Sequence, residues 1–309
     1  MKIFFNRVPR NEPYGGGNQF LLGIVEKLKN LGHNVVFHLE DNIDLIFMMD
    51  PRPGDIGYSL QHIAGYKQHF PSVKIIHRVN ECDKRKGTNE IDSLLLAGMS
   101  ISDEVIFISE WLREYFKDLG FDKPSNVIYN GCDLSHFRPR QKKSKTSKVK
   151  LVTHHWSDNW MKGFDLYTEI DRYIKNNPDC NLEFAYIGRY YKGYNPTSTH
   201  IIEPTFGPDL GDKLRDHDIY VTASKFEPCG MHHVEGSASG LPVIYHTDGG
   251  GINELCKKHG EEFSNFEQFL LAVNKVSQNI DDYLSKINYE YLSLDRCLDE
   301  YAEIIEKVK

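Results

Sequence analysis

Two glutamates stand eight residues apart in the segment KFEPCGMHHVEGSASGLPVIYHTDGGGINEL, which runs from Lys225 to Leu255. They are Glu227 and Glu235, and a proline, several small residues and a run of glycines accompany them. Such a segment suits metal binding, phosphate binding, or a strand–helix–strand unit that binds nothing. The elements expected to carry these residues distinguish the three interpretations.

The helix predicted after a strand at 218–224 favours an anion. Pro228 has the residue type preferred in the first turn of a helix, so we expect the helix to begin there. The first N–H groups of a helix lack partners within it and bind anions without side chains. Glu227 would precede this helix, and Glu235 would lie about two turns into it, roughly 10 Å further along, a span that suits a sugar diphosphate with its nucleoside. The exposed N–H groups would belong to Cys229, Gly230 and Met231.

The two adjacent histidines of this segment argue against a metal. His232 and His233 are neighbours on the predicted helix, where successive side chains diverge by about 100°. Helical metal ligands are instead spaced i, i+4 on one face. We therefore expect no metal site, although one histidine can hydrogen-bond a ligand near the helix start.

A lysine marks the start of another predicted helix. Lys162 and Gly163 precede the segment FDLY, whose apolar residues continue at helical spacing. A cation at a helix N-terminus is electrostatically misplaced unless an anion lies there. His154 and His155 come earlier, on a predicted strand, and alternate between its faces, so at most one meets a common ligand.

The first half of the chain offers weaker signals. Gly15, Gly16 and Gly17 precede a helix, and such a glycine turn brings backbone N–H groups close to an anion, although a flexible turn is an equally good interpretation. The dinucleotide fingerprint is absent, because its third glycine would fall at Phe20. His77 ends a predicted strand, where it would either bond a ligand or pack as a core histidine.

Short apolar runs alternate with helical patterns throughout, which is typical of α/β domains with parallel sheets covered by helices on both faces. The first set of predicted strands covers 2–5, 34–39, 44–49, 73–79, 104–109 and 126–130. The second set covers 149–156, 182–190, 199–204, 218–224 and 241–247. Ligands of such sheets bind outside the carboxyl ends of the strands, so the residues that matter should follow strands.

The basic run Arg138–Lys150 separates the two sets. We interpret it as a solvated linker between domains 1–140 and 141–309, with binding to a phosphate-rich surface as the alternative. The C-terminal end is helical and charged, and packing of its helices back onto the first domain is left open.

Composition limits the class of protein. The 309 residues carry a net charge of −7, which argues against a nucleic-acid partner. No apolar run approaches the roughly 18 residues that cross a bilayer, and the N-terminus is predicted to form a strand, not a signal peptide. Six cysteines lie far apart with no C-x-x-C pair, which favours a reducing cytoplasm over a zinc ribbon or a disulfide scaffold.

The order of these features resembles the retaining GT-B glycosyltransferases of glycosyltransferase family 4, over nearly the whole chain. Its most specific part is the E-x7-E arrangement of EPCGMHHVEGSASGLPVI followed by GGGINEL. VIYNGCDLSHFRP at 127–139 is similar to that family's end-of-domain segment, and MKGFDLY to its Lys-Gly helix start. The resemblance implies two Rossmann-like α/β domains facing across a cleft, with the acceptor side at 1–140 and the nucleotide-sugar donor side at 141–309.

The resemblance also implies roles for the candidate residues. Glu235 would accept the ribose hydroxyls of the nucleotide, and Glu227 would bind the transferred sugar with the N–H groups of Cys229, Gly230 and Met231. Lys162 would neutralise the leaving diphosphate, and His77 would contact the sugar near the reacting carbon. Gly15, Gly16 and Gly17 would meet the donor phosphates.

One departure concerns the diphosphate. The family usually has an arginine a few residues before the lysine, whereas here the equivalent is His155, or Trp156 without a gap. Because arginine is always charged and histidine only partly so near neutrality, this change weakens the diphosphate clamp. Arg189 or a histidine can compensate.

These implications predict a retaining, metal-independent glycosyltransferase with no cofactor, acting on a nucleoside-diphosphate sugar and a glycan, lipid or small-molecule acceptor. We expect a cytoplasmic protein, with peripheral contact at a membrane left open. Two alternatives are a sugar-nucleotide epimerase of the same two-domain fold and a non-catalytic nucleotide-sugar binder.

Overall fold

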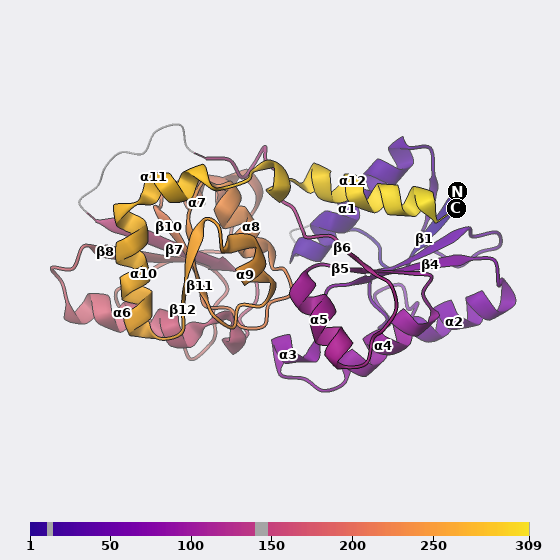
Figure 1. Ribbon diagram of the computed structural model, residues 1–309, viewed down its shortest axis with the longest axis horizontal. Helices are drawn as coiled ribbons and strands as arrows, with labels where there is room; N and C mark the ends of the chain where they lie inside the picture. The colour runs from indigo at the N-terminus through magenta and orange to yellow at the C-terminus, as the bar shows by residue number, and fades with distance from the viewer. Residues whose placement is uncertain (11–14, 140–147, 309) are drawn as a thin grey trace. The chain divides into compact units, whose positions relative to one another are not determined.

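The computed structural model describes residues 1–10, 15–139 and 148–308, which form two compact units (Figure 1). One unit comprises Met1–Asn130 and Leu294–Lys309, and the other comprises Gly131–Ser293. The sequence placed a single division at residue 140, within a basic run of which 140–147 lie outside the described residues. No helix in the described ranges is both long and apolar enough to span a bilayer.

The first unit contains a parallel six-stranded sheet, as predicted, in the order β2-β1-β3-β4-β5-β6. Its four central strands are mostly buried on both faces, which explains why they appear in the sequence as continuous apolar runs, whereas the edge strands β2 and β6 are partly exposed. The strands are β1 Lys2–Phe5, β2 Asn34–Val36, β3 Leu45–Met48, β4 Lys74–Val79, β5 Glu104–Phe107 and β6 Asn126–Val127.

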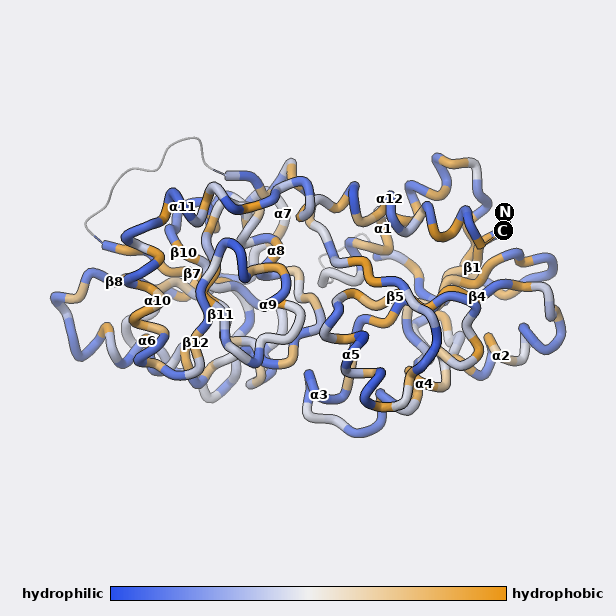
Figure 2. The backbone as a smooth tube through the Cα atoms, viewed as in Figure 1, coloured by the Kyte–Doolittle hydropathy of each residue, from blue (hydrophilic) through white to orange (hydrophobic). Residues whose placement is uncertain are grey.

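Helices cover both faces of this sheet, and alternate residues of each strand pack against opposite faces. Phe5 and Phe47 belong to a cluster with α1 and α12, whereas Phe4 and Ile46 pack with α2 on the other face. Figure 2 shows the hydrophobic residues concentrated along the strands. The helices are α1 Gly15–Asn30, α2 Leu60–His69, α3 Asp83–Lys86, α4 Ile91–Ile101, α5 Glu110–Asp118 and α12 Leu294–Lys307.

The C-terminal helix α12 belongs to the first unit, where it packs along α1 (Figure 1). The rings of Phe20 and Tyr301 lie 4.6 Å apart between centroids, and Lys27 forms an ion pair with Asp299. The last helix therefore completes the core of the unit in which the chain begins.

The second unit repeats the architecture, with a parallel six-stranded sheet in the order β12-β11-β10-β7-β8-β9. Five of these strands match predicted runs, and β12 was not predicted. The strands are β7 Val149–His155, β8 Leu182–Gly188, β9 His200–Ile202, β10 Ile219–Thr222, β11 Val243–His246 and β12 Gly260–Phe263. The helices are η1 Trp160–Lys162, α6 Phe164–Asn176, α7 Gly207–Arg215, α8 Met231–Ala238, α9 Gly251–Cys256, α10 Phe266–Gln278, α11 Ile280–Ser285 and η2 Glu290–Leu292.

The start of α8 differs from the prediction. The helix begins at Met231, with Gly230 as its N-cap in an extended conformation, and not at Pro228. The reason is a backbone pairing, because Glu227 N–H donates to Gly249 C=O at 3.2 Å and Gly251 N–H donates to Glu227 C=O at 2.9 Å. This pairing holds Glu227 in a bridge with Gly250, and the helix begins only after the bend at Pro228 and Cys229.

Candidate active site

Lys162 and Glu227 form a buried ion pair at the carboxyl edge of the second sheet. Lys162 Nζ donates to Glu227 Oε2, and the two residues are 9% and 2% exposed. Lys162 ends the short helix η1, whose start is capped by Asn159 Oδ1 accepting from the Met161 N–H at 2.8 Å. The predicted lysine at a helix start is thus placed against an acid of the E-x7-E segment.

Gly163 allows Lys162 to lie this close to the sheet. Its φ is +98°, and a Cβ there would lie 2.2 Å from the Cβ of Ala223, just after β10. No other residue type adopts that conformation without strain and fits this space. The Lys-Gly pair therefore fixes Lys162 beside the carboxyl end of β10.

The segment before α8 is positioned with comparable precision. Phe226 has a φ of +54°, which is uncommon for a residue other than glycine, and its N–H donates to Asp248 C=O at 2.7 Å. A Cβ on Gly230 would lie 2.6 Å from Nδ1 of His232 and 3.0 Å from Cδ of Glu227. Left-handed backbone at a non-glycine residue persists only where the surroundings impose it, and such residues cluster at functional sites.

Glu235 lies on α8, four residues after the helix begins, so it is about 6 Å along the axis from Met231. Its Oε2 is 2.8 Å from Nε2 of His154 at the end of β7, and Nδ1 of His154 is 3.1 Å from the Tyr220 hydroxyl. The Glu235 side chain is 16% exposed. A carboxylate accepts several hydrogen bonds, so one histidine contact leaves capacity for hydroxyl donors.

The N-terminus of α8 supplies polar backbone between the two acids. Because the helix begins at Met231, its first N–H groups belong to Met231 and the two histidines, not to Cys229 and Gly230 as predicted. Cys229 instead lies in a bend before the helix, and Gly230 is its extended N-cap residue. The first N–H groups of the helix are thus two residues further along the chain than predicted, and they still lie between Glu227 and Glu235.

His155 lies inside the second unit. Its Nε2 is 2.9 Å from the Tyr167 hydroxyl, its ring centroid is 4.7 Å from that of His232, and it is 3% exposed. Burial, followed by the positive charge of Lys162, lowers the pKa of His155 well below its usual value. A neutral imidazole in this position supplies no permanent positive charge to a diphosphate.

The adjacent histidines His232 and His233 are also buried. His232 Nε2 is 3.0 Å from Thr222 Oγ1, whereas neither ring nitrogen of His233 has a hydrogen-bond partner. Burial lowers the pKa of His233 to about 3. Among the described residues, no group of three His, Cys, Asp or Glu side chains lies close enough together to hold a metal ion.

In the first unit, His77 lies within β4, followed by Arg78 and Val79 of the same strand, so it does not end the strand as predicted. It is 0% exposed, burial lowers its pKa to about 4, and neither ring nitrogen has a hydrogen-bond partner. A Cβ on Gly98 of α4 would lie 2.8 Å from Cε1 of His77, so the ring lies directly beneath that helix. The predicted contact of His77 with a sugar stays a prediction.

The three glycines of the first unit are the first residues of α1, so they do not precede the helix as predicted. Gly15 has a φ of +72°, and a Cβ on Gly17 would lie 4.0 Å from Nδ2 of Asn80, which follows β4. Gly16 is the second residue of the helix. The glycines thus stand at a helix N-terminus beside the carboxyl end of a strand, and their contact with donor phosphates stays a prediction.

The sequence named Arg189 as a possible substitute for the missing arginine, but it indicated neither the ring contact of Arg189 nor that of Arg78. Arg78 is 1% exposed, lies 4.3 Å over the Phe20 ring and donates to Asn130 Oδ1 at 2.8 Å. Arg189 lies 4.4 Å over the Trp156 ring, just beyond β8 and β7. A contact between an arginine and a ring that are far apart in the chain leaves no local pattern in the sequence.

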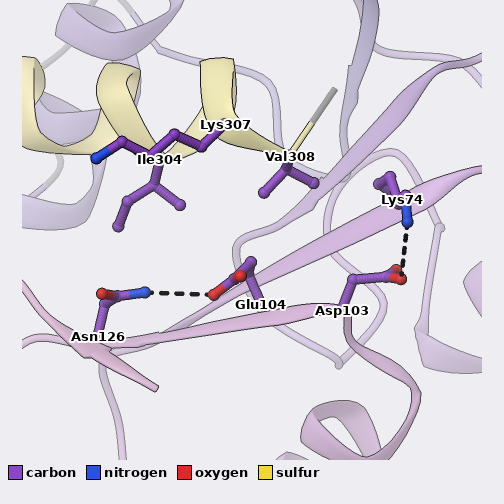
Figure 3. A pocket seen from close by; sticks show the side chains of 7 residues that line it. All are labelled: Lys74, Asp103, Glu104, Asn126, Ile304, Lys307 and Val308. Atoms are coloured by element: carbon purple, nitrogen blue, oxygen red, sulfur yellow. Dashed lines mark hydrogen bonds and ion pairs between the residues drawn. The ribbon is translucent and has the colours of Figure 1, made fainter. Parts of the chain in front are cut away.

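A pocket of about 440 Å³ opens at the other end of the first sheet (Figure 3). Lys74 and Glu104 begin β4 and β5, so this pocket lies at the amino edge of the sheet, away from the edge where ligands of parallel sheets bind. No predicted site residue contributes to it. Its lining residues are Lys74, Asp103, Glu104, Asn126, Ile304, Lys307 and Val308.

Comparison with known proteins places this geometry in context. No protein-family model matches the sequence. Over 94 residues the chain is 35% identical to a Thermosipho melanesiensis protein named "Probable sucrose-phosphate synthase". That match covers 29% of this chain and only 22% of the relative, so the chain spans about a fifth of the relative's length.

Solved structures resemble the chain over its whole length. A sucrose-phosphate synthase from Thermosynechococcus elongatus superimposes with a TM-score of 0.73 at 12% identity, covering 99% of this chain and 98% of that one. Anabaena HepE in complex with UDP-glucose gives 0.71 at 14% identity, covering 99% and 100%. WaaG, described as a glycosyltransferase involved in lipopolysaccharide biosynthesis, gives 0.66 at 13% identity, covering 99% of each chain.

Two parallel six-stranded sheets with flanking helices, matched over 99% of the chain by these structures, confirm the predicted fold class. The chain has the GT-B fold, and its structural neighbours are GT-B glycosyltransferases.

Proposed function

We propose that the chain is a retaining glycosyltransferase that moves a sugar from a nucleoside-diphosphate sugar to a glycan, lipid or small-molecule acceptor. The observation that carries this proposal is the grouping of Lys162, Glu227 and Glu235 around the N-terminus of α8. A cation, two carboxylates and helix N–H groups there suit the charged and hydroxylated parts of such a donor.

Each part of the donor finds a matching group. Glu235, whose carboxylate contacts His154 at 2.8 Å, would accept the ribose hydroxyls. Glu227 would accept hydroxyls of the transferred sugar, and the N–H groups at the start of α8 would face the diphosphate. HepE was solved with UDP-glucose, and again with UDP and glucose, so a UDP-sugar is the first donor to test.

The reaction transfers charge to the leaving diphosphate as the bond from the anomeric carbon to the phosphate oxygen breaks. Groups aimed at this developing charge stabilise the transition state electrostatically. Lys162 would exchange part of its interaction with Glu227 for the diphosphate, which leaves the Glu227 carboxylate available to the sugar. We propose that these protein groups, and no divalent metal, neutralise the leaving group, and that the acceptor attacks on the face from which the diphosphate leaves.

The six cysteines are all free, as a reducing compartment requires. This supports the proposal that the enzyme is cytoplasmic. Its acceptor, if lipid-linked, would bring it into peripheral contact with a membrane.

The test is a binding and turnover panel on the purified chain. Calorimetry with nucleoside diphosphates of several bases, then with their sugars, should identify one donor, and incubation with acceptors should release the nucleoside diphosphate. Glu235→Ala should weaken donor binding, whereas Glu169→Ala, which removes an exposed glutamate on α6, should not.

The outcomes separate the candidate functions. An epimer formed from donor alone would identify an epimerase, and only slow hydrolysis of the donor is expected of a transferase. Tight donor binding without turnover across many acceptors would identify a binder. The proposal fails if no nucleotide sugar binds.

A further inference from the structure

Arg189 and Trp156 form a cation–π pair at the carboxyl edge of the second sheet. His155 lies opposite Gly188 in the parallel pairing of β7 with β8, so Trp156 and Arg189 are the first residues beyond the two strands. The Arg189 N–H donates to His155 C=O at 3.1 Å, which fixes the backbone there. The guanidinium carbon lies 4.4 Å from the indole centroid.

This arginine differs from Lys162 in how its charge is compensated. Lys162 is buried and faces Glu227, so part of its field is cancelled before any ligand arrives. Within the described residues, no carboxylate lies at ion-pair distance from Arg189, and its side chain is exposed. Its partner is instead the face of Trp156, which is itself 37% exposed.

The donor of the proposed reaction needs such a cation. A nucleoside diphosphate carries at least two negative charges, and Lys162 shares its own charge with Glu227. His155 cannot supply the missing positive charge, because its burial keeps the imidazole neutral. Arg189 is permanently charged and lies at the same edge of the sheet, so it can supply the additional positive charge that the diphosphate needs.

We propose that Arg189, oriented by Trp156, binds the diphosphate of the nucleotide donor. The inference rests on the proposed function and deepens it by adding a binding residue. Contact with the indole face orders the guanidinium, which carries five N–H donors in one plane. Those donors match the oxygens of a phosphate in a bidentate arrangement that a lysine does not provide.

The test compares a nucleoside diphosphate with the nucleoside that lacks its phosphates. The probes are UDP and uridine, or the corresponding pair for whichever base the donor panel selects, with affinities measured by calorimetry on the whole chain. Arg189→Gln should weaken UDP binding about tenfold or more and change uridine binding less than about twofold. Arg189→Lys should recover part of the loss, since it restores the charge without the planar fork.

Trp156 is tested in the same way. Trp156→Ala should weaken UDP binding less than Arg189→Gln does, because the cation remains but is no longer ordered, and Trp156→Phe should restore part of the loss. The matched control is Arg172→Gln, which removes an exposed arginine from α6 in the same unit and should change neither affinity.

The results distinguish this inference from the proposed function. If the wild-type chain binds a nucleoside diphosphate and Arg189→Gln binds it equally well, Arg189 is an ordinary solvated side chain and the inference is wrong. If UDP and uridine affinities fall together, Arg189 does not act through the phosphates, and the inference is again wrong. If the wild-type chain binds no nucleoside diphosphate, the proposed function itself fails.

Discussion

His154 and Glu235 come from different elements of the second unit, and Nε2 of the histidine lies 2.8 Å from Oε2 of the glutamate. His154 is the last residue but one of β7, and its other ring nitrogen is 3.1 Å from the Tyr220 hydroxyl of β10. The carboxylate of α8 is therefore oriented by a histidine that a tyrosine orients in turn. Such support fixes a ligand-binding group before the ligand arrives.

Replacing His154 should weaken nucleoside binding while leaving Glu235, the hydrogen-bond acceptor for the ribose hydroxyls, in place. His154→Ala removes one hydrogen bond from Glu235, so we expect uridine affinity to fall about fivefold, which corresponds to roughly 1 kcal/mol. Glu235→Ala should cost more, because it removes the acceptor itself. Calorimetry with uridine and with UDP checks both, and His154→Gln, which can still donate to Glu235, should recover part of the loss. Equal losses for His154→Ala and Glu235→Ala would contradict a supporting role.

The buried pair of Lys162 and Glu227 should show strong coupling in a double-mutant cycle. Either Lys162→Met or Glu227→Gln removes a buried opposite charge, and we expect each to lower the free energy of unfolding by about 3–5 kcal/mol. The double variant should lose less than the sum, because neither charge is then left without the other. Urea unfolding checks this in a Trp111→Phe background, where fluorescence of the remaining tryptophans, Trp156 and Trp160, reports the second unit. Additive losses would show that the two side chains do not stabilise each other.

Gly163→Ala should disturb both stability and the position of Lys162. The added Cβ would lie 2.2 Å from the Ala223 Cβ, at a φ of +98° that alanine rarely adopts, so the loop has to move. We expect the free energy of unfolding to fall by at least about 2 kcal/mol, from steric overlap and backbone strain together. The same fluorescence measurement tests it. Glu169→Ala, at an exposed position of α6 in the same unit, is the control and should be tolerated.

The strands of both sheets were predictable because their burial on two faces produces continuous apolar runs. The exception is β12, whose sequence GEEF contains a single large apolar residue. It lies at the edge of the second sheet, where only one neighbouring strand pairs with it. Such a strand does not need the continuous apolar sequence of a central strand. Its parallel pairing with β11 is a tertiary contact that the segment itself does not indicate.

The site was predictable only in part, for a related reason. The predicted helix starts identified Lys162, Glu227 and Glu235, because a charged residue at or near a helix N-terminus indicates an anion site. The same rules placed the start of α8 at Pro228, and the pairing of Glu227 with the Gly249–Gly251 turn overrode them. The contact of His154 with Glu235 joins residues 81 positions apart, which only the sheet order brings together.

Acid should destabilise the chain through its buried histidines, and His233 provides a sensitive test. Burial lowers the pKa of His233 to about 3, whereas an unfolded histidine titrates near 6.5. Between these values the unfolded chain binds the proton and the folded chain does not. The contribution of neutral, buried His233 to the free energy of unfolding is therefore complete above about pH 6.5. It is lost as the pH falls toward 3, at about 1.4 kcal/mol per pH unit. His77 and His259, whose pKa values burial lowers to about 4, act in the same direction.

His233→Leu removes this linkage, so the free energy of unfolding should fall less steeply between about pH 6 and 4, by up to about 1.4 kcal/mol per pH unit. The comparison uses the slope with pH, which is independent of any constant gain or loss from repacking the 0% exposed site. His200→Gln, at an exposed position of β9, should leave the slope unchanged. An unchanged slope in His233→Leu would mean that this ring is protonated or rehydrated in the folded chain, because only a histidine that stays neutral while folded contributes the difference in bound protons.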